Sequence, residues 1–238
     1  MNGKTQIAAD TAGAAEACAE RTLALLEEAL GGRDFATLAV SGGHTPQLLF
    51  QKMAARRFEW SRLHVFWVDE RCVPPEDPAS NYKLAKDNLI ALAHIPERNV
   101  HRIVGEIAPK EAATRYINEI RQFFGLGSGE KPVFDVAQCG MGPDGHTASL
   151  FPGDPLIHDR EGIAAAVFAP QFHQWRVTLL PGTLLATRHI LYLVDGADKA
   201  ETLRAVLNEP MQPDKYPAQV IGENAEWFVD GEAGGLLK

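Results

Sequence analysis

Short apolar runs alternate with amphipathic segments along most of this chain. A short apolar run bounded by turn residues is typical of a buried strand. The pattern predicts strands over residues 36–40, 63–68, 132–137, 163–168, 176–180 and 190–195, and two closing strands over 218–221 and 227–229. The polar, proline-rich segment 69–79 is predicted as a loop.

Segments with helical periodicity separate several of these runs. The first helix is predicted over residues 11–30, with Asp10 or Thr11 as its cap and Gly31-Gly32 as its stop. Further helices are predicted from about Pro46, from Ser80 or Asn81 to about Leu92, over 109–124 and over about 199–207. Strands that alternate with helices indicate a Rossmann-like α/β fold, in which an open, largely parallel sheet carries helices on both faces.

Composition and charge narrow the class of protein. The 238 residues contain no Ser/Pro-rich linker, repeat or low-complexity block, so residues 1–238 are expected to form a single α/β domain. The formal net charge of -8 argues against nucleic acid or an anionic membrane as the main partner. A local basic site remains compatible with that charge, and an anionic small substrate would need one.

Cysteine and histidine spacing gives no sign of a metal site. Cys18, Cys72 and Cys139 are widely spaced, and no His-x-x-x-His or His-Glu-x-x-His pair occurs. The chain has neither a signal-like start nor an apolar run of about 18 residues, so no membrane span is expected. We expect a cytoplasmic protein that uses no metal and no organic cofactor.

Three polar segments follow three of the predicted strands directly. Ser41-Gly42-Gly43 follows the first strand, Asp69-Glu70-Arg71 the second, and Gly140–His146 the third. Ligands of open α/β sheets bind outside the carboxyl ends of the strands. The three segments are therefore expected to meet at one site.

Residues 140–153 form the most distinctive of these loops. Glycine permits positive φ and close approach of the backbone to a ligand, so Gly142 and its neighbours could bring Asp144 and His146 to a bound molecule. Imidazole is the side chain best suited to general-base catalysis near neutral pH. The alternative is a structural turn in which Asp144 caps the next helix and His146 is merely exposed.

The turn after the first strand has the composition of a phosphate cradle. Its two glycines lead into a helix, whose free N–H groups attract anions. It matches neither the P-loop nor the dinucleotide-binding fingerprint. A tight turn with a capping hydroxyl is the alternative.

Three cations lie near the ends of predicted strands. Arg71 could hold a phosphate or carboxylate, and a neighbouring carboxylate could orient it. Arg176 begins a strand, and Lys199 lies in a strand-to-helix turn. Each of them alone is more often a solvated surface group. Together with the Ser-Gly-Gly turn, they indicate a phosphorylated substrate.

Four segments recur in this order in a known family: Ser41–Pro46, Val68–Pro74, Ser80-Asn81-Tyr82 and Gly140–Gly153. Over about residues 8–230, the chain resembles the 6-phosphogluconolactonases, within the wider glucosamine-6-phosphate isomerase/deaminase superfamily. Its most specific motifs are Asp-Glu-Arg-x-Val-Pro with the following Ser-Asn-Tyr, and Asp-Gly-His-x-Ala-Ser-Leu-Phe-Pro-Gly.

The resemblance implies hydrolysis of 6-phospho-D-glucono-1,5-lactone to 6-phosphogluconate in the oxidative pentose phosphate pathway. His146 would be the general base for an attacking water, oriented by Asp144 or a backbone carbonyl, and Arg71 with loop N–H groups would stabilise the oxyanion. No Gly-x-Ser-x-Gly elbow occurs, which also favours activated water over an acyl-enzyme. The substrate-binding residues would be Ser41, Gly42, Gly43, His44, Thr45, Asp69, Gly142, Arg176 and Lys199.

The resemblance also bears on two alternatives. The deaminases of the superfamily carry a Glu where this chain has Phe151, which cannot transfer a proton. A sugar-phosphate sensor would need an attached helix-turn-helix, and the first 35 residues contain only one long helix. The chain departs from the lactonase pattern at Leu180 and Leu185, so any polar role of those two positions is in doubt.

Overall fold

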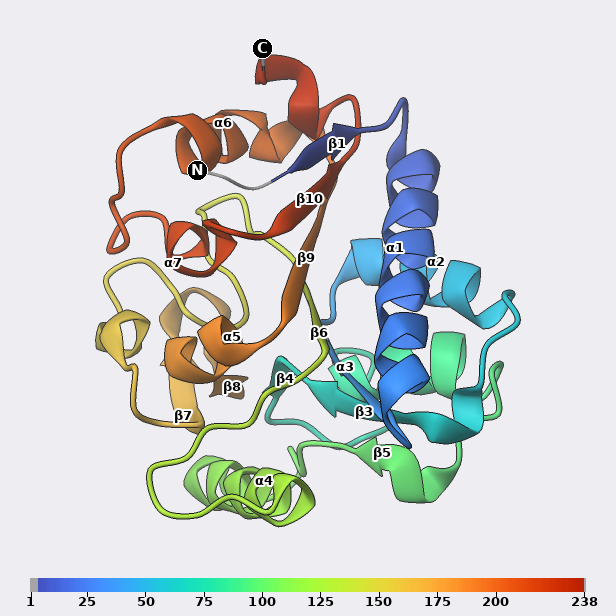
Figure 1. The fold of residues 1–238 in the computed structure, drawn as a ribbon. Coiled ribbons are helices and arrows are strands. Elements are labelled where there is room, and N and C mark those ends of the chain that lie inside the picture. The colour runs from blue at the N-terminus through green and yellow to red at the C-terminus, as the bar shows by residue number, and fades with distance from the viewer. Residues whose placement is uncertain (1–3, 238) are drawn as a thin grey trace.

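The computed structural model describes residues 4–237 and centres on a seven-stranded sheet (Figure 1). The strand order is β1-β10-β9-β6-β2-β3-β5, and the pairings in it are parallel. The strands are β1 (Thr5–Ile7), β2 (Ala36–Val40), β3 (Leu63–Trp67), β5 (Val100–His101), β6 (Val136–Cys139), β9 (His189–Val194) and β10 (Glu226–Val229). The expected Rossmann-like α/β fold is confirmed.

Helices cover both faces of this sheet. Figure 1 shows α1 and α2 on one side and α5, α6 and α7 on the other. The helices are α1 (Thr11–Gly32), α2 (His44–Ala54), α3 (Asn81–Ala85), α4 (Pro109–Phe124), α5 (Pro181–Ala186), α6 (Ala200–Asn208) and α7 (Ala218–Gly222). The prediction for α4 is correct at both ends, because Pro109 starts the helix and Gly125 ends it in the left-handed conformation.

A second sheet of three antiparallel strands accompanies the first. It contains β4 (Asp69–Arg71), β8 (Gln174–Leu179) and β7 (Ala164–Ala169), in that order. The expectation that residues 69–71 lie in a loop is therefore wrong, and the strands predicted at 163–168 and 176–180 lie outside the parallel sheet. The turn at 170–173 is too short for the crossover that a parallel pair requires, so β7 and β8 pair as a hairpin.

Residues 218–221, expected to form a closing strand, are instead part of α7. The preceding Pro217 has φ -53°, which suits the start of a helix. All five residues of α7 are buried. A fully buried helix lacks the amphipathic period that separates it from a buried strand in a sequence.

The topology gathers the carboxyl ends of several strands at one edge of the parallel sheet. Strands β9, β6, β2 and β3 are consecutive neighbours there. Tyr116 of α4 fixes the end of β3, because its hydroxyl accepts a hydrogen bond from the backbone N–H of Trp67 at 2.9 Å and donates one to the Trp67 carbonyl at 2.7 Å. The chain then leaves β3 and enters β4 in the second sheet. Within residues 4–237, no helix has both the length and the apolar character to cross a membrane.

Candidate active site

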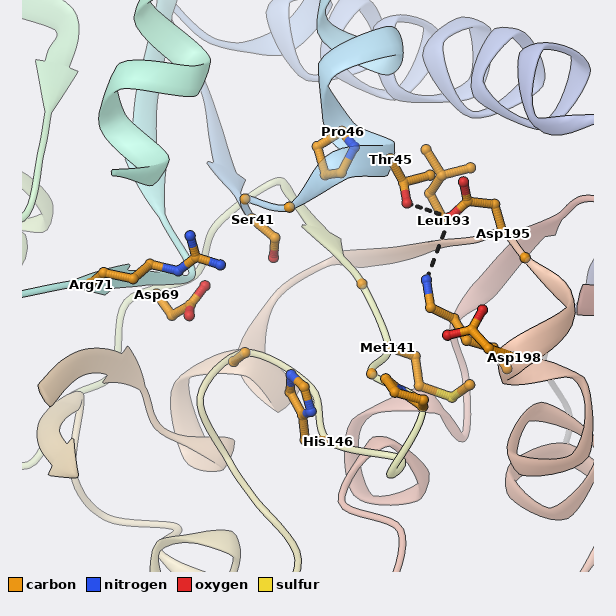
Figure 2. Close-up of a pocket in the computed structure, with 18 of the residues that line it drawn as sticks. Ser41, Thr45, Pro46, Asp69, Arg71, Met141, His146, Leu193, Asp195 and Asp198 are labelled. Carbon is orange, nitrogen blue, oxygen red and sulfur yellow. Dashed lines mark hydrogen bonds and ion pairs between the residues drawn. The ribbon is translucent and has the colours of Figure 1, made fainter. Parts of the chain in front are cut away.

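A cavity of about 410 Å³ opens at this edge (Figure 2). Ten of the twelve residues named from the sequence line it: Ser41, Gly42, Gly43, Thr45, Asp69, Arg71, Gly142, His146, Arg176 and Lys199. Asp144 touches His146 without lining the cavity itself. The side chain of His44 lies outside the described part of the structure, so its expected role is not tested. The strand-end segments thus converge as expected.

His146 and Asp144 form a closely bonded pair in the loop after β6. Nδ1 of His146 lies 2.5 Å from Oδ1 of Asp144, and the His146 backbone N–H donates to the same oxygen at 3.1 Å. Burial alone would raise the pKa of Asp144, but the bonds and charge of His146 outweigh it and lower that pKa below its usual value. An ionised Asp144 favours the proton on Nδ1, which leaves Nε2 of His146 free to accept a proton.

The loop folds so tightly around residue 142 that only glycine fits there. Its N–H donates to the carbonyl of His146 at 2.9 Å, and its carbonyl accepts from Gly145 at 3.0 Å, where φ is 82°. A Cβ atom on Gly142 would lie 2.2 Å from ring atoms of His146 and 2.8 Å from Oδ1 of Asp144. Any larger residue would therefore displace the His–Asp pair.

Phe151 packs beside the imidazole of His146. The ring centroids of Phe151 and His146 are 4.8 Å apart. The guanidinium of Arg176 lies 5.6 Å from the centroid of the same phenyl ring, and 4.7 Å from that of Phe172. Such distances suit cation–π contacts. The apolar ring supplies no proton to the site.

Arg71 and Arg176 are directly paired residues of β4 and β8. Nη1 of Arg71 donates to the Ala79 carbonyl at 2.6 Å, whereas Nη1 of Arg176 lies 3.7 Å from Oδ2 of Asp69. Burial lowers the pKa of Arg176, and the neighbouring Arg71 charge contributes. The Nε atoms of both arginines are buried and have no hydrogen-bond partner among the described residues. Both arginines also line the cavity.

The carboxylates beside Arg71 do not hold its guanidinium, contrary to the expectation that one of them could orient it. Asp69 accepts from the Ser149 hydroxyl at 2.6 Å and from Nδ2 of Asn81 at 3.2 Å. Glu70 accepts from the backbone N–H groups of Arg71, Asn81 and Tyr82, each at 2.7 Å. Both acids are buried and hold the loops around the cavity.

The opposite end of the cavity is formed by the start of α2. Gly43 precedes the helix with φ 113°, a conformation that favours glycine, and no side chain caps the helix. The hydroxyl oxygen of Ser41 is buried without a partner among the described residues. In Figure 2 this oxygen points toward the cavity. Free helix N–H groups, this hydroxyl and Lys199 together form an arrangement suited to an anion.

Three polar residues were not predicted as part of the site. Asp195 accepts a hydrogen bond from the Thr45 hydroxyl and lies 3.4 Å from Nζ of Lys199, and Asn81 and Ser149 bind Asp69. Asp195 directly follows β9, so the strand-end rule could have found it. Residues 4–237 contain no group of three His, Cys, Asp or Glu side chains that could hold a metal ion.

The fold and the cavity define an α/β protein in which a cavity lined by three cations lies beside a His–Asp pair. The chain belongs to the family described as glucosamine-6-phosphate isomerases/6-phosphogluconolactonase, whose sequence profile matches residues 9–229.

Its relatives include proteins named 6-phosphogluconolactonase. One from Synechocystis sp. is 35% identical over 216 residues, which cover 90% of this chain and 89% of that protein. One from Haemophilus influenzae is 37% identical over 207 residues, covering 84% of this chain and 87% of that protein. The solved structure of a 6-phosphogluconolactonase from Thermotoga maritima has a TM-score of 0.83 at 29% identity, with 96% of this chain and 99% of that chain covered.

Proposed function

We propose that this protein is a lactone hydrolase that converts 6-phospho-D-glucono-1,5-lactone to 6-phosphogluconate. The observation that carries the proposal is the 2.5 Å contact of Asp144 with His146, which lines a cavity together with Arg71, Arg176 and Lys199. The names of the relatives support the same activity. The expected partner is a small phosphorylated sugar lactone.

In the proposed mechanism, Nε2 of His146 takes a proton from a water molecule as its oxygen attacks the lactone carbonyl carbon. The carbonyl oxygen becomes an oxyanion, which Arg71 and loop N–H groups stabilise. When the intermediate collapses, the bond from the carbonyl carbon to the ring oxygen breaks. His146 then returns its proton to that oxygen. Asp144 holds the imidazole in the required tautomer and stabilises its charged form.

The phosphate is assigned to the far end of the cavity. The start of α2, Ser41 and Lys199 line this part of the cavity, and Arg176, the direct cross-strand partner of Arg71, serves as a second cation. Asp69 and Gly142 act by holding the loops in place: Asp69 through Ser149 and Asn81, and Gly142 by leaving room for His146. Neither the attack of water nor the collapse of the intermediate, as proposed, requires a metal or an organic cofactor.

Phe151 supports lactone hydrolysis over sugar isomerisation or deamination. Those reactions need an additional proton-transferring group near the histidine, and the buried phenyl ring occupies that place. We further propose that the chain acts as a single α/β domain in the cytoplasm, within the oxidative pentose phosphate pathway. The net charge of -8 fits a small-molecule substrate better than nucleic acid as the main partner.

The test is to supply freshly made 6-phosphogluconolactone at pH 6–7, where spontaneous hydrolysis is slow, and to measure acid release. In parallel, glucosamine 6-phosphate is supplied and ammonia is measured. We expect lactone hydrolysis only, and a loss of about 10²-fold or more in His146→Asn. Ammonia release would refute the proposed reaction. A folded His146→Asn variant with near-wild-type rate would refute the base.

A further inference from the structure

A carboxylate occupies the part of the cavity where a phosphate is expected. Asp195 directly follows β9, and a dashed line in Figure 2 joins it to Thr45 on α2. Its Oδ1 atom accepts the Thr45 hydrogen bond and also lies 3.4 Å from Nζ of Lys199. The lysine that would hold an anion is thus already paired with an anion of the protein.

The formal charges around the cavity cancel. The lining residues include the cations Arg71, Arg176 and Lys199 and the carboxylates Asp69, Asp195 and Asp198. Asp69 is engaged by Ser149 and Asn81, and Asp198 is exposed. Asp195 is therefore the carboxylate that faces Lys199 and the start of α2.

The pairing of Asp195 with Lys199 is loose enough to be displaced. A charge-assisted N–H···O bond is typically about 2.7–2.9 Å long, whereas this separation is 3.4 Å. Both side chains are mostly buried, with 15% and 18% of their surfaces exposed, so solvent screens their interaction only in part. A phosphate at the start of α2 would compete with Asp195 for Lys199. The carboxylate of Asp195 would also repel it.

We propose that Asp195 is an internal competitor for the phosphate group of substrate and product. It weakens the binding of both substrate and product and so speeds departure of the product. The identity of the phosphorylated ligand rests on the proposed function, but the competition itself concerns any phosphate at this end of the cavity. Binding that is weakened equally in ground and transition states changes KM without lowering kcat.

The test is Asp195→Asn, which removes the charge and keeps an oxygen to accept the Thr45 hydrogen bond. Inorganic phosphate and 6-phosphogluconate are titrated into the full chain by calorimetry, and KM for the lactone is measured separately. We expect both dissociation constants and KM to fall about three- to tenfold, the range of a partly screened ion pair. Asp198→Asn is the control, because it removes a negative charge from the same turn but no contact with Lys199. We expect it to change the dissociation constants and KM by less than about twofold.

A Lys199→Ala background tests whether the two residues act on each other. If Asp195 acts through Lys199, Asp195→Asn should tighten binding much less in that background. Unchanged or weaker phosphate binding in Asp195→Asn, with an unchanged melting temperature, would overturn the competition and make Asp195 a support for Lys199. If the wild-type protein binds both ligands but hydrolyses no lactone, the proposed function fails while the competition can still be judged.

Discussion

The phenyl ring of Phe151 packs against the imidazole of His146, with the ring centroids 4.8 Å apart and the planes inclined by 46°. The same ring lies beneath the guanidinium of Arg176 at 5.6 Å. One apolar side chain therefore contacts both the proposed base and one of the proposed substrate-binding cations.

Shortening Phe151 should loosen both of its neighbours. Phe151→Ala should lower the free energy of unfolding by about 3 kcal/mol, because it empties a buried aromatic site. It should also lower kcat/KM about tenfold or more. Phe151→Leu retains most of the packing, so its losses of unfolding free energy and of kcat/KM should both be smaller. Denaturant unfolding and lactone hydrolysis measure these effects. Phe168→Ala removes a phenyl ring that is 41% exposed and should leave the rate near wild type; an equal loss there would contradict a specific role of Phe151.

Adding one methyl group at Gly142 should disable the site. The new Cβ would lie 2.2 Å from the ring of His146, so Gly142→Ala must push the imidazole away from Asp144. We expect kcat to fall about 10²-fold, as misplacement of a reacting group by about 1 Å can do. Gly140→Ala is the matched control, because its Cβ meets no atom within 4 Å. Comparable losses in the two variants would argue against this steric explanation.

Neutralising Asp144 should impair catalysis with little effect on binding. In Asp144→Asn, the amide no longer fixes the proton on Nδ1 of His146 or stabilises the charged imidazole. We expect kcat to fall about 10²-fold, with KM changed by less than about threefold. Asp154→Asn provides the control, because asparagine can still accept from the backbone N–H of Leu156 as Asp154 does at 2.8 Å. A large rise in KM with an unchanged kcat would instead place Asp144 in substrate binding.

The stability of the protein should fall in mild acid through His64. Burial, followed by the charges of His101 and Arg98, lowers the pKa of His64 to about 4 from its usual 6.5. Between those values the unfolded chain binds a proton that the folded chain does not, so stability decreases as the pH falls from about 6.5 to about 4. The slope from this group is below about 1.4 kcal/mol per pH unit, because part of the ring is exposed.

Unfolding curves at several pH values measure this slope. In His64→Gln the slope should be shallower than in the wild type over the same interval. His158→Gln is the control, since His158 is an exposed histidine paired with exposed Asp214. Equal slopes in wild type and His64→Gln would show that other groups govern the acid sensitivity.

The sequence predicted those elements whose signals are local. Helix α4 has a proline at its start, a glycine at its end and an amphipathic face between them. Strand β4 is different, because its three residues form a strand only by pairing with β8, about a hundred positions further along the chain. No pattern within residues 69–79 contains that partner. The same reason explains why the second sheet was not foreseen.

The sequence predicted which residues at the strand ends would meet in the site, but not which partners the charged side chains would bind. Ser41 and His146 meet because the parallel strands β2 and β6 end at one edge of the sheet, and Arg71 follows a few residues after the end of β3. Whether a given carboxylate faces a guanidinium, a lysine or backbone N–H groups depends on loop geometry. Glu70 binds three N–H groups, while Asp195 binds Thr45 and Lys199. Neighbours in sequence did not reveal these partners.

The direct pairing of Arg71 with Arg176 across β4 and β8 has a consequence for redesign. Directly opposite residues of an antiparallel pair project from the same side of the sheet at a separation that the backbone sets. The pairing of β4 with β8 therefore sets the distance between the two positive charges, and insertions in loops elsewhere leave that distance unchanged. Residues 41–43 or 195–199 could therefore be remodelled without changing the spacing of the two arginines. A one-residue shift in the register of β8 would turn the Arg176 side chain to the opposite face of the sheet, away from Arg71.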